Sequence, residues 1–132
     1  MKTGLIRDPK QITQAIEFNL SSGNIHPTDI DAVLEFDNDV LILFEVKKVG
    51  NDLPYGQRLL LERLVDSWGG RYAVALFCHH TVFNPENPIL LNECMIKEVY
   101  QGNKWKEHNE IVESAVKRIA EIFNIKKLSE LR

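Results

Sequence analysis

The feature that most constrains the fold is a regular pattern of apolar residues between positions 30 and 46. In the two segments 30–36 and 40–46 every even-numbered residue is apolar, whereas the odd-numbered residues include several carboxylates. Alternate side chains of a β-strand lie on the same face of a sheet, so the pattern predicts two strands that share one buried face. The even-numbered residues are Ile30, Ala32, Leu34, Phe36, Val40, Ile42, Phe44 and Val46.

The residues between these segments, 37–39, have the sequence Asp-Asn-Asp and predict a tight turn. Asn and Asp tolerate the left-handed backbone that short hairpin loops need. A three-residue loop makes opposed residues share parity, which matches the two apolar faces, whereas a two-residue loop would not. The register that follows pairs Phe36 with Val40, Ala32 with Phe44, Asp31 with Glu45, and Asp29 with Lys47.

This register brings the carboxylates of Asp31 and Glu45 within about 5 Å of each other, measured between β-carbons. Like charges that face each other destabilise a sheet, and a divalent cation would relieve the repulsion. The odd-numbered residues of the second strand change from Leu41 and Leu43 to Glu45 and Lys47, so its end is predicted to open onto a polar cleft. The ordinary alternative is that these groups are solvated charges at the end of a hairpin.

Two helices are predicted on either side of the hairpin in the chain. Residues 9–21 carry apolar residues at helical spacing, and Glu17 lies beside that stripe as a candidate metal ligand or a solvated side chain. Asn51 or Asp52 is predicted to cap a second helix that has Pro54 in its first turn. Gln57 lies one turn before Leu61 on the apolar stripe of that helix, facing either a specific partner or solvent.

The rest of the chain predicts further strands and a last helix. Residues 72–78 read as a buried strand parallel to the second strand, with the preceding helix as the crossover, and 93–100 as another strand. A short return strand is predicted at Trp105 and a helix over 108–123, followed by a frayed tail over 124–132. The expected fold class is α/β, with a mixed central sheet flanked by helices.

Composition bounds the kind of protein. The 132 residues suit one domain, and neither a membrane span nor a signal peptide is visible, which predicts a cytoplasmic protein without membrane contact. Cys78 and Cys94 have no CxxC partner, so reduced thiols are favoured over a disulfide framework. Cys78, His79 and His80 could bind zinc with Cys94, but zinc sites usually have paired ligands at both ends and Cys94 has no such partner. The net charge of −3 weighs against strong DNA binding without a basic patch, metal or partner.

Asp31, the Glu45-Val46-Lys47 triplet and Gln57 at a helix start together resemble the PD-(D/E)XK nuclease superfamily. The chain looks most like its small single-domain members, the Holliday-junction resolvases and short nuclease-like proteins of phage and mobile elements. The motifs cover residues 13–68, and the rest resembles the family only in the order of elements. A departure is that no proline directly precedes Asp31, whereas Pro27 precedes Thr28-Asp29, so both Asp29 and Asp31 are candidates for the primary ligand.

The resemblance implies a restriction-endonuclease-like core over residues 1–132 and a site that binds Mg²⁺, for which Mn²⁺ would substitute. By position, Asp31 and Glu45 would bind the metal, with Asp29 and Glu17 as further candidates. Lys47 would position the attacking water and stabilise negative charge, and Gln57 would complete the catalytic set. Arg58 is expected to reach substrate phosphate. Small resolvases of this family act as dimers, so a homodimer is compatible with it.

The function predicted from the sequence is therefore a Mg²⁺-dependent nuclease that hydrolyses phosphodiester bonds in DNA, with branched or junction DNA as a candidate substrate. A second hypothesis is a catalytically inactive module of the same fold that binds nucleic acid or a protein partner. A third is a structural dimer formed through the last helix. The pattern does not distinguish exonuclease from endonuclease activity.

Overall fold

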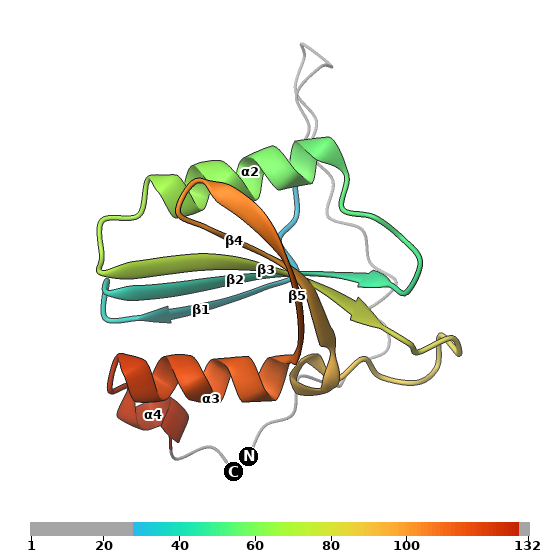
Figure 1. The fold of residues 1–132 in the computed structure, drawn as a ribbon. Helices are drawn as coiled ribbons and strands as arrows, with labels where there is room; N and C mark the ends of the chain where they lie inside the picture. The colour runs from blue at the N-terminus through green and yellow to red at the C-terminus, as the bar shows by residue number, and fades with distance from the viewer. Residues whose placement is uncertain (1–27, 130–132) are drawn as a thin grey trace, which may run out of the picture.

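The computed structural model of the chain describes residues 28–129, which form a five-stranded mixed sheet with helices on both faces (Figure 1). The strand order is β1-β2-β3-β4-β5, antiparallel except for the parallel pair β2–β3. The predicted α/β class with a mixed sheet is confirmed. The elements are β1 (Ala32–Phe36), β2 (Val40–Lys48), α2 (Tyr55–Asp66), β3 (Tyr72–His80), η1 (Leu91–Glu93), β4 (Met95–Gln101), β5 (Lys104–Ile111), α3 (Val112–Ile122) and α4 (Lys126–Ser129).

The β1–β2 hairpin has the predicted register. Phe36 pairs with Val40 and Ala32 with Phe44, and the Asp39 N–H donates to the Phe36 carbonyl oxygen at 2.9 Å. Asp37 and Asn38 have φ angles of 54° and 59°, the left-handed conformation that these residue types accept. The turn chemistry therefore sets the register of the hairpin, as the sequence predicted.

The sheet separates two hydrophobic cores, one under each helix. The even-numbered residues of β2 pack with Val112, Ala115 and Ile119 of α3. The odd-numbered residues Leu41 and Leu43 pack against α2, whose buried side chains are also part of that second core. Because β2 is buried on both faces, its residues from Val40 to Phe44 are all apolar. Glu45 is the first polar residue of the strand.

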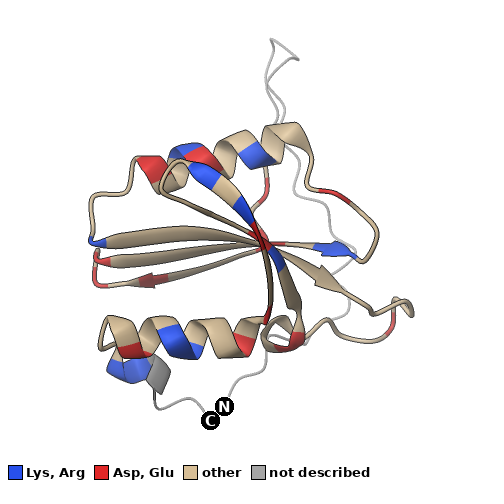
Figure 2. Ribbon diagram, viewed as in Figure 1, with Lys and Arg blue, Asp and Glu red and all other residues tan. Residues whose placement is uncertain are grey.

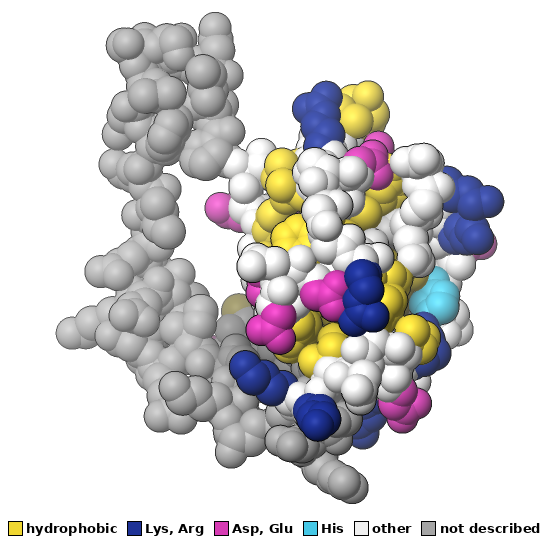
Figure 3. Space-filling model, turned by 90° about the vertical axis from the view of Figure 1, so that its left-hand side faces the viewer, with side chains coloured by type: hydrophobic (Ala, Val, Ile, Leu, Met, Phe, Trp, Pro, Cys, Tyr) yellow, Lys and Arg dark blue, Asp and Glu magenta, His cyan; other side chains and the backbone are white. Residues whose placement is uncertain are grey.

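The chain returns from α2 to β3 at the same end of the sheet as the hairpin turn. The Asp39 carbonyl oxygen accepts from the Trp68 indole at 3.0 Å and from the Tyr72 N–H at 3.1 Å, while the Asp39 carboxylate is bound by the Arg71 guanidinium. A Cβ at Gly70 would lie 2.3 Å from the Asp39 carbonyl oxygen, so only glycine fits. Figure 3 views this end, where acidic and basic side chains are interspersed.

Several predicted boundaries were wrong. The helix predicted from residue 108 begins at Val112, because 108–111 continue β5 and pair with β4, where Met95 lies opposite Ile111. The caps predicted at Asn51 or Asp52 are absent, since α2 begins at Tyr55 with Pro54 at the N-cap and no side-chain cap bond. Part of the tail predicted to fray, 126–129, forms α4.

The helix predicted over residues 9–21, together with Glu17, lies outside the described residues, as do 130–132. Within residues 28–129, no helix has the length and apolar character needed to cross a membrane.

Candidate functional site

Asp31 and Glu45 lie side by side where the β1–β2 ladder ends. Asp31 immediately precedes β1, and its Oδ2 accepts a hydrogen bond of 2.7 Å from the Val46 N–H on the neighbouring strand. The carboxylate therefore takes the place that a backbone carbonyl would occupy if the ladder continued. This bond fixes the Asp31 side chain next to Glu45, in the register that the hairpin turn established.

Glu45 is the one charged residue of 28–129 that is fully buried, with 2% of its surface exposed. Burial, together with the neighbouring charge of Asp31 and a hydrogen bond to it, raises the pKa of Glu45 to about 7. Lys47 opposes this increase without cancelling it. Removing a carboxylate from water beside a second carboxylate disfavours its charged form, and a bound proton or cation would relieve that cost.

Lys47 lies two residues beyond Glu45 on β2, so both side chains lie on the α2 side of the sheet. The Lys47 Nζ is 3.8 Å from Glu45 Oε1. This separation allows an ion pair but is too long for a hydrogen bond. The ammonium is thus beside the carboxylate while its donors remain available to another group.

Gln57 belongs to the first turn of α2 and contributes a buried acceptor without a partner. Its Oε1 atom is inaccessible to solvent, and within the described part of the chain no group donates a hydrogen bond to it. An unpaired buried polar atom costs about 1–3 kcal/mol. Because Gln57 precedes Leu61 by one turn on the side of α2 that packs against β2, it lies in the same layer as Glu45.

The other predicted ligands are not brought into this cluster. The β1–β2 ladder ends at the pair Ala32–Phe44, so neither expected pairing beyond it, Asp31 with Glu45 or Asp29 with Lys47, is part of the ladder. Asp31 contacts β2 through its side chain instead, whereas Asp29 is exposed. Glu17 lies outside the described residues. Among residues 28–129 no group of three or more His, Cys, Asp or Glu side chains is arranged to hold a metal ion. The described site therefore offers two carboxylates, Asp31 and Glu45.

Arg58, expected to reach substrate phosphate, is engaged within the protein. Its guanidinium donates to both carboxylate oxygens of Glu98, at 3.2 and 3.1 Å, and its Cζ lies 4.6 Å from the centre of the Trp105 ring. Trp105 in turn donates to Glu62, one turn further along α2. Arg58 thus helps to join α2 to β4 and β5, and a phosphate would have to displace Glu98 to bind it.

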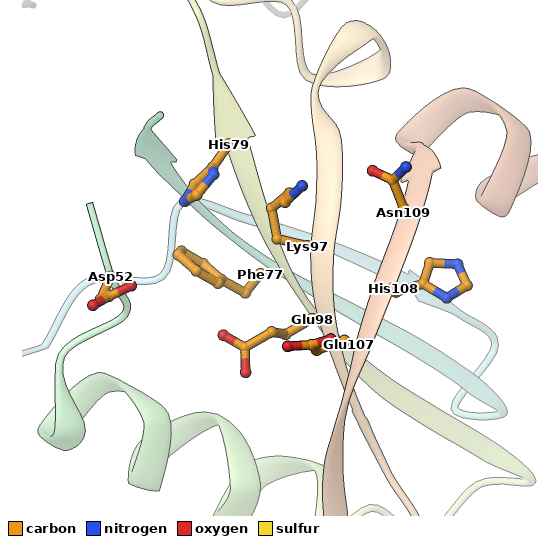
Figure 4. A pocket seen from close by; sticks show the side chains of 8 residues that line it. All are labelled: Asp52, Phe77, His79, Lys97, Glu98, Glu107, His108 and Asn109. Atoms are coloured by element: carbon orange, nitrogen blue, oxygen red, sulfur yellow. The ribbon is translucent and has the colours of Figure 1, made fainter. Parts of the chain in front are cut away.

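A pocket of about 870 Å³ lies beside this cluster (Figure 4). The sequence predicted a polar cleft at the end of β2 but not the residues from β3, β4 and β5 that line this pocket. Phe77 pairs with Glu45 and His79 pairs with Lys47 across the β2–β3 ladder, so the pocket wall continues directly from the candidate residues. Figure 4 shows Lys97 and Glu98 on the next strand and Asp52 on the segment before α2. Only the tertiary pairing of distant strands assembles this wall, and no local motif in the sequence marks it.

The two cysteines weighed for zinc share one core, and each of the two histidines has its own hydrogen-bond partner. Cys78 and Cys94 are free and buried in the core on the α3 side. The ring of His79 is hydrogen-bonded to the Asn51 carbonyl oxygen at 2.8 Å, and His80 Nδ1 accepts from the Val82 N–H. These contacts give each imidazole a local structural partner.

No protein-family model, curated protein or solved structure matches this chain. The resemblance to PD-(D/E)XK nucleases therefore depends on the residues themselves and on their placement at the end of β2.

Proposed function

We propose that this protein is a divalent-metal-dependent nuclease with a restriction-endonuclease-like core, which hydrolyses phosphodiester bonds in DNA. The observation that carries the proposal is the buried Glu45 carboxylate, which lies beside Asp31 and 3.8 Å from the Lys47 ammonium. A buried carboxylate with a strongly raised pKa and specific charged neighbours is typical of functional sites more than of structural ones.

The residues present fit a hard divalent cation such as Mg²⁺ or Mn²⁺. Mg²⁺ is commonly bound by one or two carboxylates and completes its coordination with water and substrate phosphate oxygens. Asp31 and Glu45 provide the two carboxylates, and their mutual repulsion would be relieved by a cation between them. When bound, the ion would lower the pKa of a water molecule and polarise the phosphoryl oxygen.

The remaining residues would orient the attacking water and balance the negative charge that develops on the phosphate. The Lys47 ammonium would donate to the attacking water and to the negative charge that develops on the phosphoryl oxygens. Gln57 would use its unpaired Oε1 to accept from that water or from Lys47, which removes the cost of a buried free acceptor. The Val46 N–H would keep Asp31 in place, acting as a positioning group.

The competing proposal is an inactive module of the same fold that binds nucleic acid or a protein. Two observations favour it: the described residues supply only two carboxylates, and Arg58 is already paired with Glu98. The net charge of −3 also gives little general attraction for DNA. A module of this kind would keep the hairpin geometry but would not require Lys47 for any activity.

The test is cleavage of plasmid, single-stranded and branched DNA by the full chain with Mg²⁺ or Mn²⁺. Lys47→Ala should reduce the cleavage rate about 100- to 1,000-fold, the usual loss when one electrostatic group is removed from a transition state. Lys117→Ala is the matched control, because Lys117 is an exposed lysine of α3 whose salt bridge, among residues 28–129, is with Glu113 of the same helix. Equal cleavage by wild type and Lys47→Ala, or no cleavage by either, would overturn the nuclease assignment.

A further inference from the structure

Two strongly exposed aromatic side chains lie at the same end of the sheet as the candidate site. Tyr55 is 75% exposed and Phe83 is 64% exposed, whereas every other aromatic residue within 28–129 is buried or partly buried. Burying an aromatic ring is strongly favourable. Two rings exposed at the end of the sheet that carries the candidate site therefore indicate a surface that a ligand or partner could cover.

Their position follows from the topology. Because β2 and β3 are parallel, their carboxyl ends meet at one edge of the sheet, and the Val49 N–H extends that pairing with a 2.9 Å bond to the His80 carbonyl oxygen (Figure 1). Phe83 follows β3 by three residues, and Tyr55 opens α2, which starts from the same edge. Tyr55 is therefore two residues from Gln57, in the first turn of that helix.

Positive charge accompanies the rings. The Lys48 ammonium lies 4.6 Å from the centre of the Phe83 ring, and Lys47 precedes it in the strand. Figure 2 shows basic residues at the end of β2, the strand whose last two residues are Lys47 and Lys48. Protein–protein interface cores are depleted of lysine, whereas aromatic rings beside basic residues are how proteins bind single-stranded nucleic acid. The combination favours unpaired bases over a protein partner.

We infer that the substrate presents unpaired bases to this end of the protein, where Tyr55 and Phe83 stack on bases that flank the phosphate held at the candidate site. The inference rests on the proposed nuclease function and narrows it to single-stranded DNA or to single-stranded regions of branched DNA. Stacking suits this role because every base has a π-face, so the contact needs no sequence recognition.

The experiment measures fluorescence anisotropy of labelled oligo-dT and of a duplex of equal length with the full chain, in low salt with EDTA, so that binding is separated from cleavage. Tyr55→Ala and Phe83→Ala should each weaken oligo-dT binding about tenfold and change duplex binding little. Tyr55→Phe keeps the ring and should bind as wild type does. Ile122→Ala alters an equally exposed apolar residue at the end of α3 and should have no effect.

The inference is overturned if wild type binds the duplex as tightly as oligo-dT, or fails to bind oligo-dT, or if both alanine variants bind it normally. The last result would also be expected if the rings served a protein partner. Failure of the nuclease proposal looks different: DNA would stay intact with Mg²⁺ or Mn²⁺ while ring-dependent binding persisted. Thermal melting of each variant should match wild type, since both side chains are exposed.

Discussion

Glu45 and Glu110 are both strand glutamates shielded from solvent, with side chains 3% and 15% exposed, yet their surroundings are opposite. The Arg118 guanidinium, helped by hydrogen bonds from His108 and Ser114, lowers the pKa of Glu110 to about 2. Burial and the neighbouring Asp31 carboxylate raise the pKa of Glu45 to about 7.

The partners explain the difference. Glu110 accepts from Ser114 Oγ at 2.9 Å, lies 2.7 Å from His108 Nε2 and pairs with Arg118, so three groups from β5 and α3 satisfy it. Glu45 has one cation, Lys47, at ion-pair distance and a second carboxylate beside it. A buried carboxylate whose charge is balanced by cations and hydrogen-bond donors of the protein stabilises the fold. A buried carboxylate without enough such partners costs stability and is expected where a ligand supplies them.

The largest expected difference between the two glutamates is in metal binding. Glu45→Gln and Asp31→Asn should each weaken Mn²⁺ binding by more than about 100-fold in calorimetric titration, because even groups outside the coordination shell cost 10- to 100-fold. Glu110→Gln should bind Mn²⁺ as wild type does. If Glu45→Gln also binds normally, or wild type shows no saturable binding, the carboxylate pair is not a metal site.

The next effect is the pH dependence of stability without metal. The pKa of Glu45 is higher in the folded chain than its usual 4.5, so its contribution to stability is complete below about pH 4.5 and is lost as pH rises through about 7. Glu45→Gln removes this ionisation and should be more stable than wild type by on the order of 2 kcal/mol at about pH 8.

Urea unfolding of wild type and Glu45→Gln across this pH range measures the effect, and the difference between the two proteins isolates Glu45 from other titrating groups. A difference that stays constant with pH would contradict the raised pKa. Bound Mn²⁺ requires the ionised carboxylate, so its affinity for wild type should increase as pH rises through about 7.

The smallest expected effect is a loss of stability in Glu110→Gln, opposite in sign to the gain expected for Glu45→Gln. Glu110→Gln should destabilise the protein by about 1–2 kcal/mol at neutral pH, because the bond to Arg118 loses its charge assistance. The pKa of Glu110 is lowered, so this contribution is present above pH 4.5 and disappears as pH falls through about 2. Urea unfolding at neutral pH and near pH 2 would check it, and a Glu110→Gln variant as stable as wild type would remove the contrast with Glu45.

The sequence predicted where the hairpin residues of the candidate site lie. The parity of the apolar residues and the Asp-Asn-Asp turn were enough to predict the register of the hairpin and to place Lys47 on the same face as Glu45. Asp31 lies beside Glu45 just beyond the last ladder pair, where its side chain bonds to the Val46 N–H. The parallel strand after α2 was also predicted and observed. These features depend on local periodicity and turn geometry, which residues close in sequence encode.

The features that were missed depend on contacts between distant segments. The sequence predicted that Arg58 would reach substrate phosphate. In the structure its guanidinium binds Glu98, which is 40 residues away in the sequence and lies on β4. The apolar stripe that includes Ile111 predicts a helix from residue 108, whereas pairing with β4 holds 108–111 in a strand. Hydrogen bonding across a sheet overrides such local patterns, as it commonly does for short segments.

The sequence by itself determined the hairpin, its register and the pairing of two carboxylates with a lysine, because a period of two allows only one arrangement that buries the apolar face. The tertiary structure alone decided that Glu45 is sealed from solvent, that the Gln57 Oε1 atom has no partner among residues 28–129, and that Arg58 is engaged by Glu98. Burial and charge pairing depend on which surfaces meet after folding. Burial and charge pairing in turn determine the pKa of a side chain and the hydrogen bonds available to it.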